Sequence, residues 1–190
     1  AETSLLFIWV RSYCVSSATL PLGAEVLMGL LNDKSYTDEQ KIARFALICS
    51  MSLFGVGGVI GFMIQGSNVT IPAHYHGSIV GVSLALMGVT YCLLPKLGYT
   101  IRDIKTAKWQ PWTYGGGQLM HIMGLVWSGG YGVQRKVAGA AQELDSIERV
   151  MGMGFMGMGG LVSSIGGVLF IIVVLRALMK KGEQRAAAPA

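Results

Sequence analysis

Long apolar runs separated by short polar stretches dominate this chain. The runs cover about residues 12–31, 41–65, 73–94, 111–133 and 149–178. Each is close to the roughly 20 residues that a helix needs to cross the hydrocarbon of a bilayer. The segments between them are polar and too short to form a domain. The pattern therefore predicts an all-α integral membrane protein with about five transmembrane helices.

Composition supports this interpretation. Hydrophobic residues make up 52% of the 190 positions and charged residues only 13%, against about a quarter charged in soluble domains, which excludes a water-soluble globule. Most of the 27 glycines sit inside apolar runs, as close packing of membrane helices requires. We expect a single transmembrane domain over residues 1–190 that ends in a disordered cytoplasmic tail at 179–190.

The basic residues predict the orientation. With five spans, the two termini lie on opposite faces, and 11 of the 15 Lys and Arg residues fall on the face that holds the C-terminus. The positive-inside rule then places the C-terminus in the cytoplasm and the N-terminus outside. We expect a multi-pass protein of the cell (plasma) membrane. Topology and contact with membrane lipid account for the net charge of +5, so no nucleic-acid partner is needed.

A pair of histidines opens the third run. His74 and His76 are separated by Tyr75 and follow Pro72, a residue suited to the first turn of a helix. On a helix, positions i and i+2 lie about 200° apart, so the two imidazoles point to opposite sides and cannot share one ion. One hypothesis is that they bind two separate haems, since histidine is a common axial haem ligand. The alternative is that both are polar residues at the membrane interface.

Arg135 and Lys136 close the fourth run on the outer face, where basic residues are disfavoured. Arginine can bind a carboxylate through two hydrogen bonds, so one hypothesis gives this pair the propionate groups of a haem. The alternative is a pair of interfacial cations that face the acidic residues of the following loop.

Two further polar residues lie inside apolar runs. Glu25 is several residues inside the first run, where a carboxylate is costly; it is a candidate for proton entry, or else a buried neutral acid. His121 lies in the middle of the fourth run, next to Gln118 and between two methionines. A hydrogen-bonded interior histidine, or one lining a polar cavity, is favoured there over a metal ligand.

Four landmarks, in the same order and spacing, resemble the second part of catalytic subunit I of the haem-copper oxygen reductases, the cytochrome c oxidase superfamily. They correspond to that family's helices eight to twelve. The landmarks are Arg11-Ser12-Tyr13 with Ser17-Ala18-Thr19, Leu20-Pro21 and Gly23; Leu53-Phe54 with Val56-Gly57-Gly58 and Gly61; Ala73-His74-Tyr75-His76; and the turn at 132–136 with its basic pair.

The resemblance implies a role for each of these residues. His74 would ligate the iron of the high-spin haem and His76 the iron of the low-spin haem, with Tyr75 between the two haems. Arg135 and Lys136 would hold propionates. The chain would then be part of a terminal oxygen reductase that reduces O2 to water. Glu25 stands where a proton-channel lysine occurs in mitochondrial-type members, so that channel is not implied.

The resemblance also implies partners. In the family, the copper-binding histidines lie on the first seven helices, whereas His121 is the only other histidine here. The resemblance therefore implies that this chain is a split or fragmentary subunit. It would be active only with another chain that carries those helices and completes the copper site. Other respiratory oxidase subunits and a donor such as cytochrome c or quinol are expected as well. The alternatives are a nitric oxide reductase-like member, a non-catalytic dihaem electron-transfer subunit, and a transporter fragment without cofactor.

Overall fold

The computed structural model of this chain is helical and describes residues 20–30, 32, 37–137, 139–142 and 144–186. After a short apolar helix at Leu20–Leu30 come α2 (Asp38–Phe62), α3 (Thr70–Lys96), α4 (Ile104–Gly130), the 3-10 turn η1 (Gly139–Gln142) and α5 (Ile147–Ala186). The extended backbone within these residues is limited to an isolated bridge between Asn68 and Gln134. The prediction of an all-α membrane protein is confirmed.

The chain divides into two units, Ala1–Tyr36 and Thr37–Ala190. In the first unit, the described part of the predicted first span is the helix Leu20–Leu30. The first residues of that span, and the landmark residues 11–19, lie outside the described residues. The second unit contains the four long helices.

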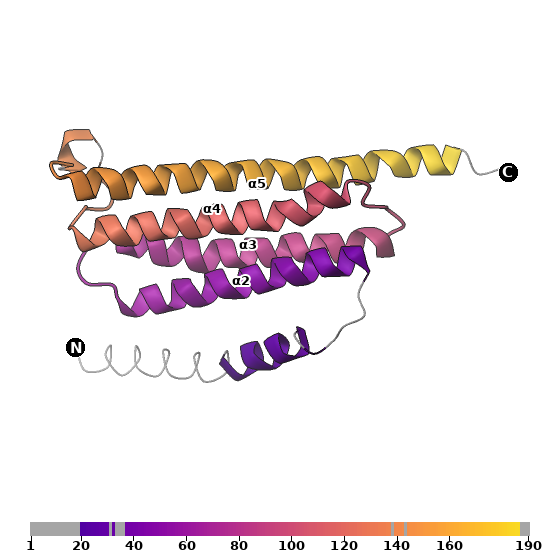
Figure 1. Cartoon of the computed structure of the whole chain (residues 1–190), viewed down its shortest axis with the longest axis horizontal. Coiled ribbons are helices and arrows are strands. Elements are labelled where there is room, and N and C mark those ends of the chain that lie inside the picture. The colour runs from indigo at the N-terminus through magenta and orange to yellow at the C-terminus, as the bar shows by residue number, and fades with distance from the viewer. Residues whose placement is uncertain (1–19, 31, 33–36, 138, 143, 187–190) are drawn as a thin grey trace. The chain divides into compact units, whose positions relative to one another are not determined.

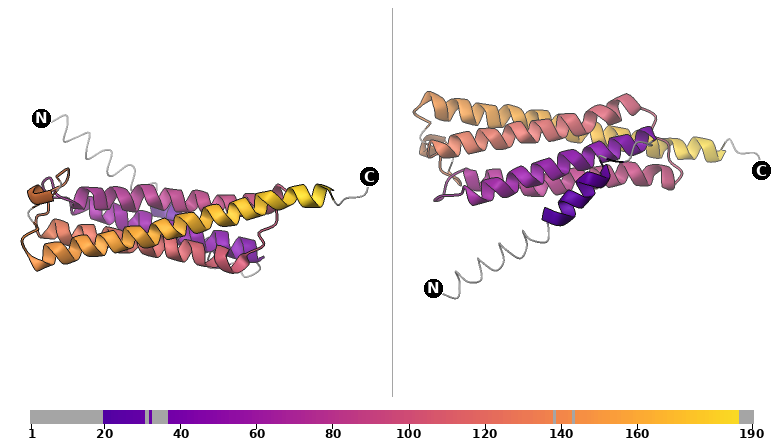
Figure 2. Two further views of the ribbon diagram at one scale, coloured as in Figure 1. Left: turned by 90° about the horizontal axis from the view of Figure 1, so that it is seen from above. Right: turned by 60° about the horizontal axis from the view of Figure 1, so that its bottom comes forward.

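These four helices lie side by side, and consecutive helices run in opposite directions (Figure 1). α2 packs chiefly on α3 and α4 on α5, while α3 also contacts α4 and joins the two pairs. The two views of Figure 2 show the same arrangement, with α5 crossing α4 at a shallow angle. The buried side chains of this unit form two core clusters. One includes Leu53, Leu84 and Ile122, and the other includes Tyr91 and Val173.

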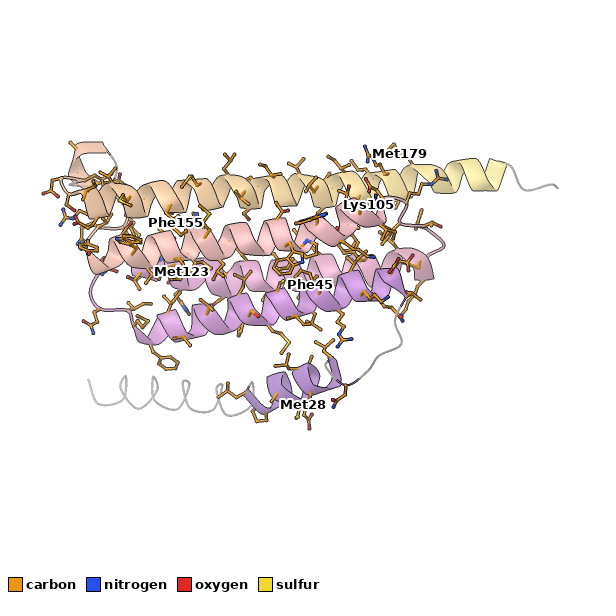
Figure 3. The ribbon with its side chains drawn as sticks, in the orientation of Figure 1. Met28, Phe45, Lys105, Met123, Phe155 and Met179 are labelled. Atoms are coloured by element: carbon orange, nitrogen blue, oxygen red, sulfur yellow. The ribbon has the colours of Figure 1, made fainter. Side chains whose placement is uncertain are left out.

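Within the described residues, three helices are long and apolar enough to cross a membrane: α2, α3 and the part of α5 at Ile147–Met179. α4 has 27 residues but carries Gln110, Gln118 and His121 and is less apolar. The prediction of about five spans is thus confirmed for three of them, and the other two remain predictions. Figure 3 shows side chains pointing outward all along the bundle, among them exposed Met123 on α4 and Phe155 on α5. Apolar outer faces are expected where lipid is the solvent.

Local chemistry sets where the helices begin. Thr37 caps α2 in a capping box: its hydroxyl accepts from Gln40 N at 3.3 Å, and Gln40 Oε1 accepts from Thr37 N at 2.9 Å. Asp103 caps α4 by accepting from Thr106 N at 3.1 Å. Because of that cap, α4 begins before Pro111, the first residue of the predicted span. α5 continues to Ala186, over residues that the sequence assigned to the tail.

Candidate functional site

His74 lies one turn into α3 and faces α2. Its Nδ1 is 2.7 Å from the carbonyl oxygen of Gly57. A carbonyl oxygen can only accept, so Nδ1 carries the proton and donates it. In the neutral ring, the lone pair is then on Nε2, the nitrogen available to a metal.

Glycines create the place for this ring. A Cβ on Gly57 would lie 2.6 Å from Ser78 N, because α2 and α3 approach each other there through the backbones of Gly57 and Gly77. One turn further along α2, a Cβ on Gly61 would lie 2.9 Å from His74 Nδ1. The absence of side chains at these positions lets the imidazole lie against α2 and reach the Gly57 carbonyl.

His76 faces α4 instead. Its ring centroid is 4.5 Å from that of His121, and the two ring planes are inclined by 58°. The Nδ1 atom of His76 is buried and has no hydrogen-bond partner within the described part of the chain. The two imidazoles of α3 therefore contact different helices, as the helical spacing requires.

Polar side chains of α4 and α5 lie on this side of α3. His121 packs on His76, Gln118 lies one turn before His121 on α4, and Ser163 of α5 bonds to Gln118. We call these four residues the His76 cluster: His76, Gln118, His121 and Ser163. Gln118 Nε2 donates to Ser163 Oγ at 2.7 Å, and His121 Nδ1 donates to the Met156 carbonyl oxygen at 2.9 Å. Gln118 Oε1 is buried and, among the described residues, has no partner.

The hydrogen bond of His121 confirms the sequence interpretation of an interior, bonded histidine. Gln118 and Ser163 were not predicted to belong to the site. One signal could have found Gln118: it precedes His121 by three residues, so both lie on the same face of α4. Nothing in the sequence indicated that Ser163 on α5 would meet this face.

Tyr75 lies between the two histidines in sequence and points away from the bundle. Its side chain is 51% exposed, and its ring centroid is 5.5 Å from that of His74. An exposed aromatic ring at this position is open to contact from outside the four helices.

The loop with the basic pair is tied to the end of α3 that carries the histidines. Val69 N donates to Val133 O at 3.0 Å, and Asn68 Nδ2 donates to Gly129 O at 3.2 Å. These bonds hold the residues just before α3 against the end of α4. Arg135 and Lys136, which follow directly, thus lie at the same end of the bundle as His74 and His76.

Within that loop, Arg135 Nε donates to Ser67 Oγ at 3.2 Å. Lys136 has a φ of 62°, in the left-handed region that only a minority of non-glycine residues adopt. The acidic residue Asp145 pairs with Arg149 at 2.8 Å, and among the described residues it forms no ion pair with Arg135 or Lys136. The binding of propionates by the pair stays a prediction.

Glu25 lies on the helix Leu20–Leu30 of the first unit and is exposed there. Its role in proton entry stays a prediction. Among the described residues, no three His, Cys, Asp or Glu side chains gather into a group that could hold a metal ion.

Comparison with known proteins gives the family. The family model for cytochrome c and quinol oxidase polypeptide I matches residues 6–169. The chain belongs to this oxidase family. Membership was expected from the landmarks at His74, His76 and the basic loop, and it accounts for the multi-pass membrane character as well.

Two curated relatives also match. Uncharacterized protein RP382 of Rickettsia prowazekii (strain Madrid E) is 38% identical over 143 residues, which is 70% of this chain and 28% of that protein. An uncharacterized protein of Aquifex aeolicus (strain VF5) is 34% identical over 70 residues, or 37% of this chain and 18% of the relative. This oxidase-family chain thus matches less than a third of either relative's length. No solved structure matches it at comparable significance.

Members of the oxidase family generally bind haems and copper. The residues of this chain fit an imidazole-ligated haem iron in one clear respect: His74 has its Nδ1 proton engaged by a backbone carbonyl, so that Nε2 is left for a metal. His76 fits in another respect. A histidine that binds a metal through Nε2 carries a proton on Nδ1, and the Nδ1 of His76 is buried and has no hydrogen-bond partner among the described residues.

Proposed function

We propose that this chain is the C-terminal portion of a split or fragmentary haem-copper terminal oxidase catalytic subunit that takes part in the reduction of O2 to water. His74 ligates the high-spin haem iron and His76 the low-spin haem iron. One observation carries the proposal: two imidazoles within one turn of α3 face different helices, so each can serve a separate metal.

When bound, haem iron supplies reversible one-electron chemistry and, at an open position, O2 binding. The chain's own part is to hold the ligands. The hydrogen bond from His74 Nδ1 to Gly57 O fixes the orientation of the ring and makes Nε2 a more basic ligand. Because the acceptor is a backbone carbonyl of a tightly packed helix, this orientation is rigid.

The basic loop supports the same assignment. Arg135 and Lys136 lie at the histidine end of α3 and would hold the propionates of a haem bound there. They would bind the carboxylates by charge-assisted hydrogen bonds. Tyr75, exposed between the two ligands, would lie between the two haems.

The remaining parts of the enzyme come from elsewhere. The sequence given has His121 as its only other histidine, so the first seven helices and the copper-binding histidines would come from another chain or from another segment. Electrons would come from cytochrome c or quinol, with other respiratory oxidase subunits present. Glu25 would admit protons from the cytoplasmic side of a plasma-membrane protein whose N-terminus lies outside and whose C-terminus lies in the cytoplasm.

The test uses the complex that copurifies with an affinity-tagged copy of this chain. His74→Ala should abolish the carbon monoxide-binding haem and leave the low-spin haem, and His76→Ala should do the reverse. Ser83→Ala is the matched control, because its hydroxyl bonds only to Ile79 O of its own helix. Full retention of both haem spectra in both histidine variants would contradict the proposal.

Metal analysis of the same complex separates the alternatives. Copper supports an oxygen reductase, whereas non-haem iron in its place indicates a nitric oxide reductase-like member. Two haems that both fail to bind carbon monoxide would indicate an electron-transfer subunit. Glu25→Gln should slow turnover with intact haem spectra. A copper-replete, oxygen-reducing preparation of this chain alone would contradict the need for a partner.

A further inference from the structure

The His76 cluster is the least expected feature of the bundle, because it gathers four polar side chains among apolar helices. Polar groups inside a membrane protein are costly and usually functional. In this cluster, two buried atoms lack hydrogen-bond partners among the described residues: His76 Nδ1, which can donate, and Gln118 Oε1, which can only accept. Leaving both unpaired in the interior destabilises the folded bundle.

The two unpaired atoms belong to neighbouring side chains. The ring of His76 packs on that of His121, and Gln118 lies one turn before His121 on the same face of α4. The two unpaired atoms therefore both belong to the contact between α3 and α4, although no hydrogen bond joins them in this structure. In apo structures, hydrogen bonds of this kind are often long and shorten when the site is filled.

In this structure, Ser163 binds the nitrogen end of the Gln118 amide. The serine hydroxyl is 2% exposed and accepts from Gln118 Nε2 at 2.7 Å. With the amide nitrogen held on α5, the oxygen Oε1 is the end left for α3. An imidazole whose Nε2 binds a metal keeps its proton on Nδ1 and needs an acceptor for it.

We propose that Gln118, held by Ser163, is a positioning residue for His76: its Oε1 accepts the hydrogen bond from His76 Nδ1 and thereby presents Nε2 to the low-spin haem iron. This inference rests on the proposed function. It assigns to the low-spin ligand an anchor made by side chains of α4 and α5, whereas the high-spin ligand is anchored by the backbone of α2.

His121 is the competing acceptor. Its ring packs on that of His76, and its Nδ1 is already engaged with Met156 O, which leaves Nε2 with a lone pair. His121→Phe keeps an aromatic ring in place but removes both nitrogens. It should therefore leave the low-spin haem largely unchanged if Gln118 is the acceptor.

The experiment measures the low-spin haem in the purified complex. Gln118→Leu should lower the affinity of the complex for this haem by about 10–100-fold, which is the usual effect of removing the hydrogen-bond partner of a ligating histidine. The same substitution should raise the midpoint potential of the low-spin haem, because a less basic ligand stabilises ferric iron less. Ser163→Ala should produce a smaller change in the same direction. Ser164→Ala is the control, since its hydroxyl bonds to Gly160 O of its own helix at 2.9 Å.

Each outcome is decisive. Unchanged affinity and potential in Gln118→Leu would overturn the proposal, as would a full effect in His121→Phe. If Gln118→Leu fails to assemble, Ser163→Ala decides: an unshifted potential overturns the proposal. Failure of the proposed function would look different, because the low-spin haem would then survive His76→Ala itself.

Discussion

His74 and His76 are two residues apart on one helix, yet their imidazoles are supported in different ways. His74 donates to a backbone carbonyl of α2 at a point where two glycines bring the helices together. His76 lies among side chains of α4 and α5. A backbone acceptor cannot be removed by substitution, whereas a side-chain acceptor can. The first ligand is therefore set by helix packing, and the second can be tuned residue by residue.

Helix packing also underlies the surroundings of His76, but it acts there through side chains. α4 and α5 are in backbone contact where Gly159 meets His121. That contact brings Met156 O within reach of His121 and Ser163 within reach of Gln118. Separating α4 from α5 would thus disturb His76 only through intermediate side chains, whereas separating α2 from α3 would break the His74 anchor directly.

The largest effect is expected for Gly57→Ala. The new Cβ would lie 2.6 Å from Ser78 N, and no side-chain rotation can relieve a contact with backbone. We expect a loss of stability of about 1–3 kcal/mol or more and weakened carbon monoxide binding by the high-spin haem. Thermal unfolding and a carbon monoxide difference spectrum of the complex measure both.

Gly58→Ala is the matched control, because a Cβ at Gly58 meets nothing within 4 Å. It should be neutral or gain about 0.5–1 kcal/mol from helix propensity. If Gly57→Ala behaved like this control, the backbone anchor of His74 would not depend on the glycine contact.

Gly159→Ala should have a smaller effect on the high-spin haem, although its clash with backbone is closer than that at Gly57. Its Cβ would collide with the backbone of His121, and the displacement of α5 would carry Ser163 and Met156 O away from α4. The low-spin haem should change its spectrum while carbon monoxide binding by the high-spin haem is retained. Gly157→Ala, with nothing within 4 Å of its Cβ, is the control. Equal loss of both haems would show that the two supports are not separate.

The smallest effect is expected for a substitution of Asp103, which lies at the end of α4 far from both histidines. The hydrogen bonds from Thr106 to Asp103, and secondarily the nearby Arg176, hold the pKa of that carboxyl below its usual value of 3.8. Its folded-state pKa is depressed, so its stabilising contribution is present above about pH 4 and is lost as the pH falls through the lower, folded-state pKa.

Asp103→Asn should remove this part of the acid dependence and leave both haem spectra unchanged at neutral pH. Thermal unfolding of the variant and the parent between pH 6 and pH 3 measures it. A change in either haem at neutral pH would mean that the two ends of the bundle are coupled, and the comparison of two local supports would fail.

Much of this protein follows from its sequence, because the signals are local. Apolar length gives the helices, as in the predicted span 73–94 within α3, and the helical repeat alone sends His74 and His76 to different sides. The apolar run does not show where α4 begins. The helix begins at Ile104, next to the cap at Asp103, in a polar stretch that precedes the run.

Only the tertiary structure decided what each imidazole meets. In a membrane helix, the outer face is as apolar as the core, so the sequence does not mark which face packs on which neighbour. The pairing of α3 with Gly57 of α2 and with Gln118 and His121 of α4 depends on contacts between residues distant in the chain. For the same reason, Ser163, whose partner lies on another helix, could not be recognised from the sequence alone.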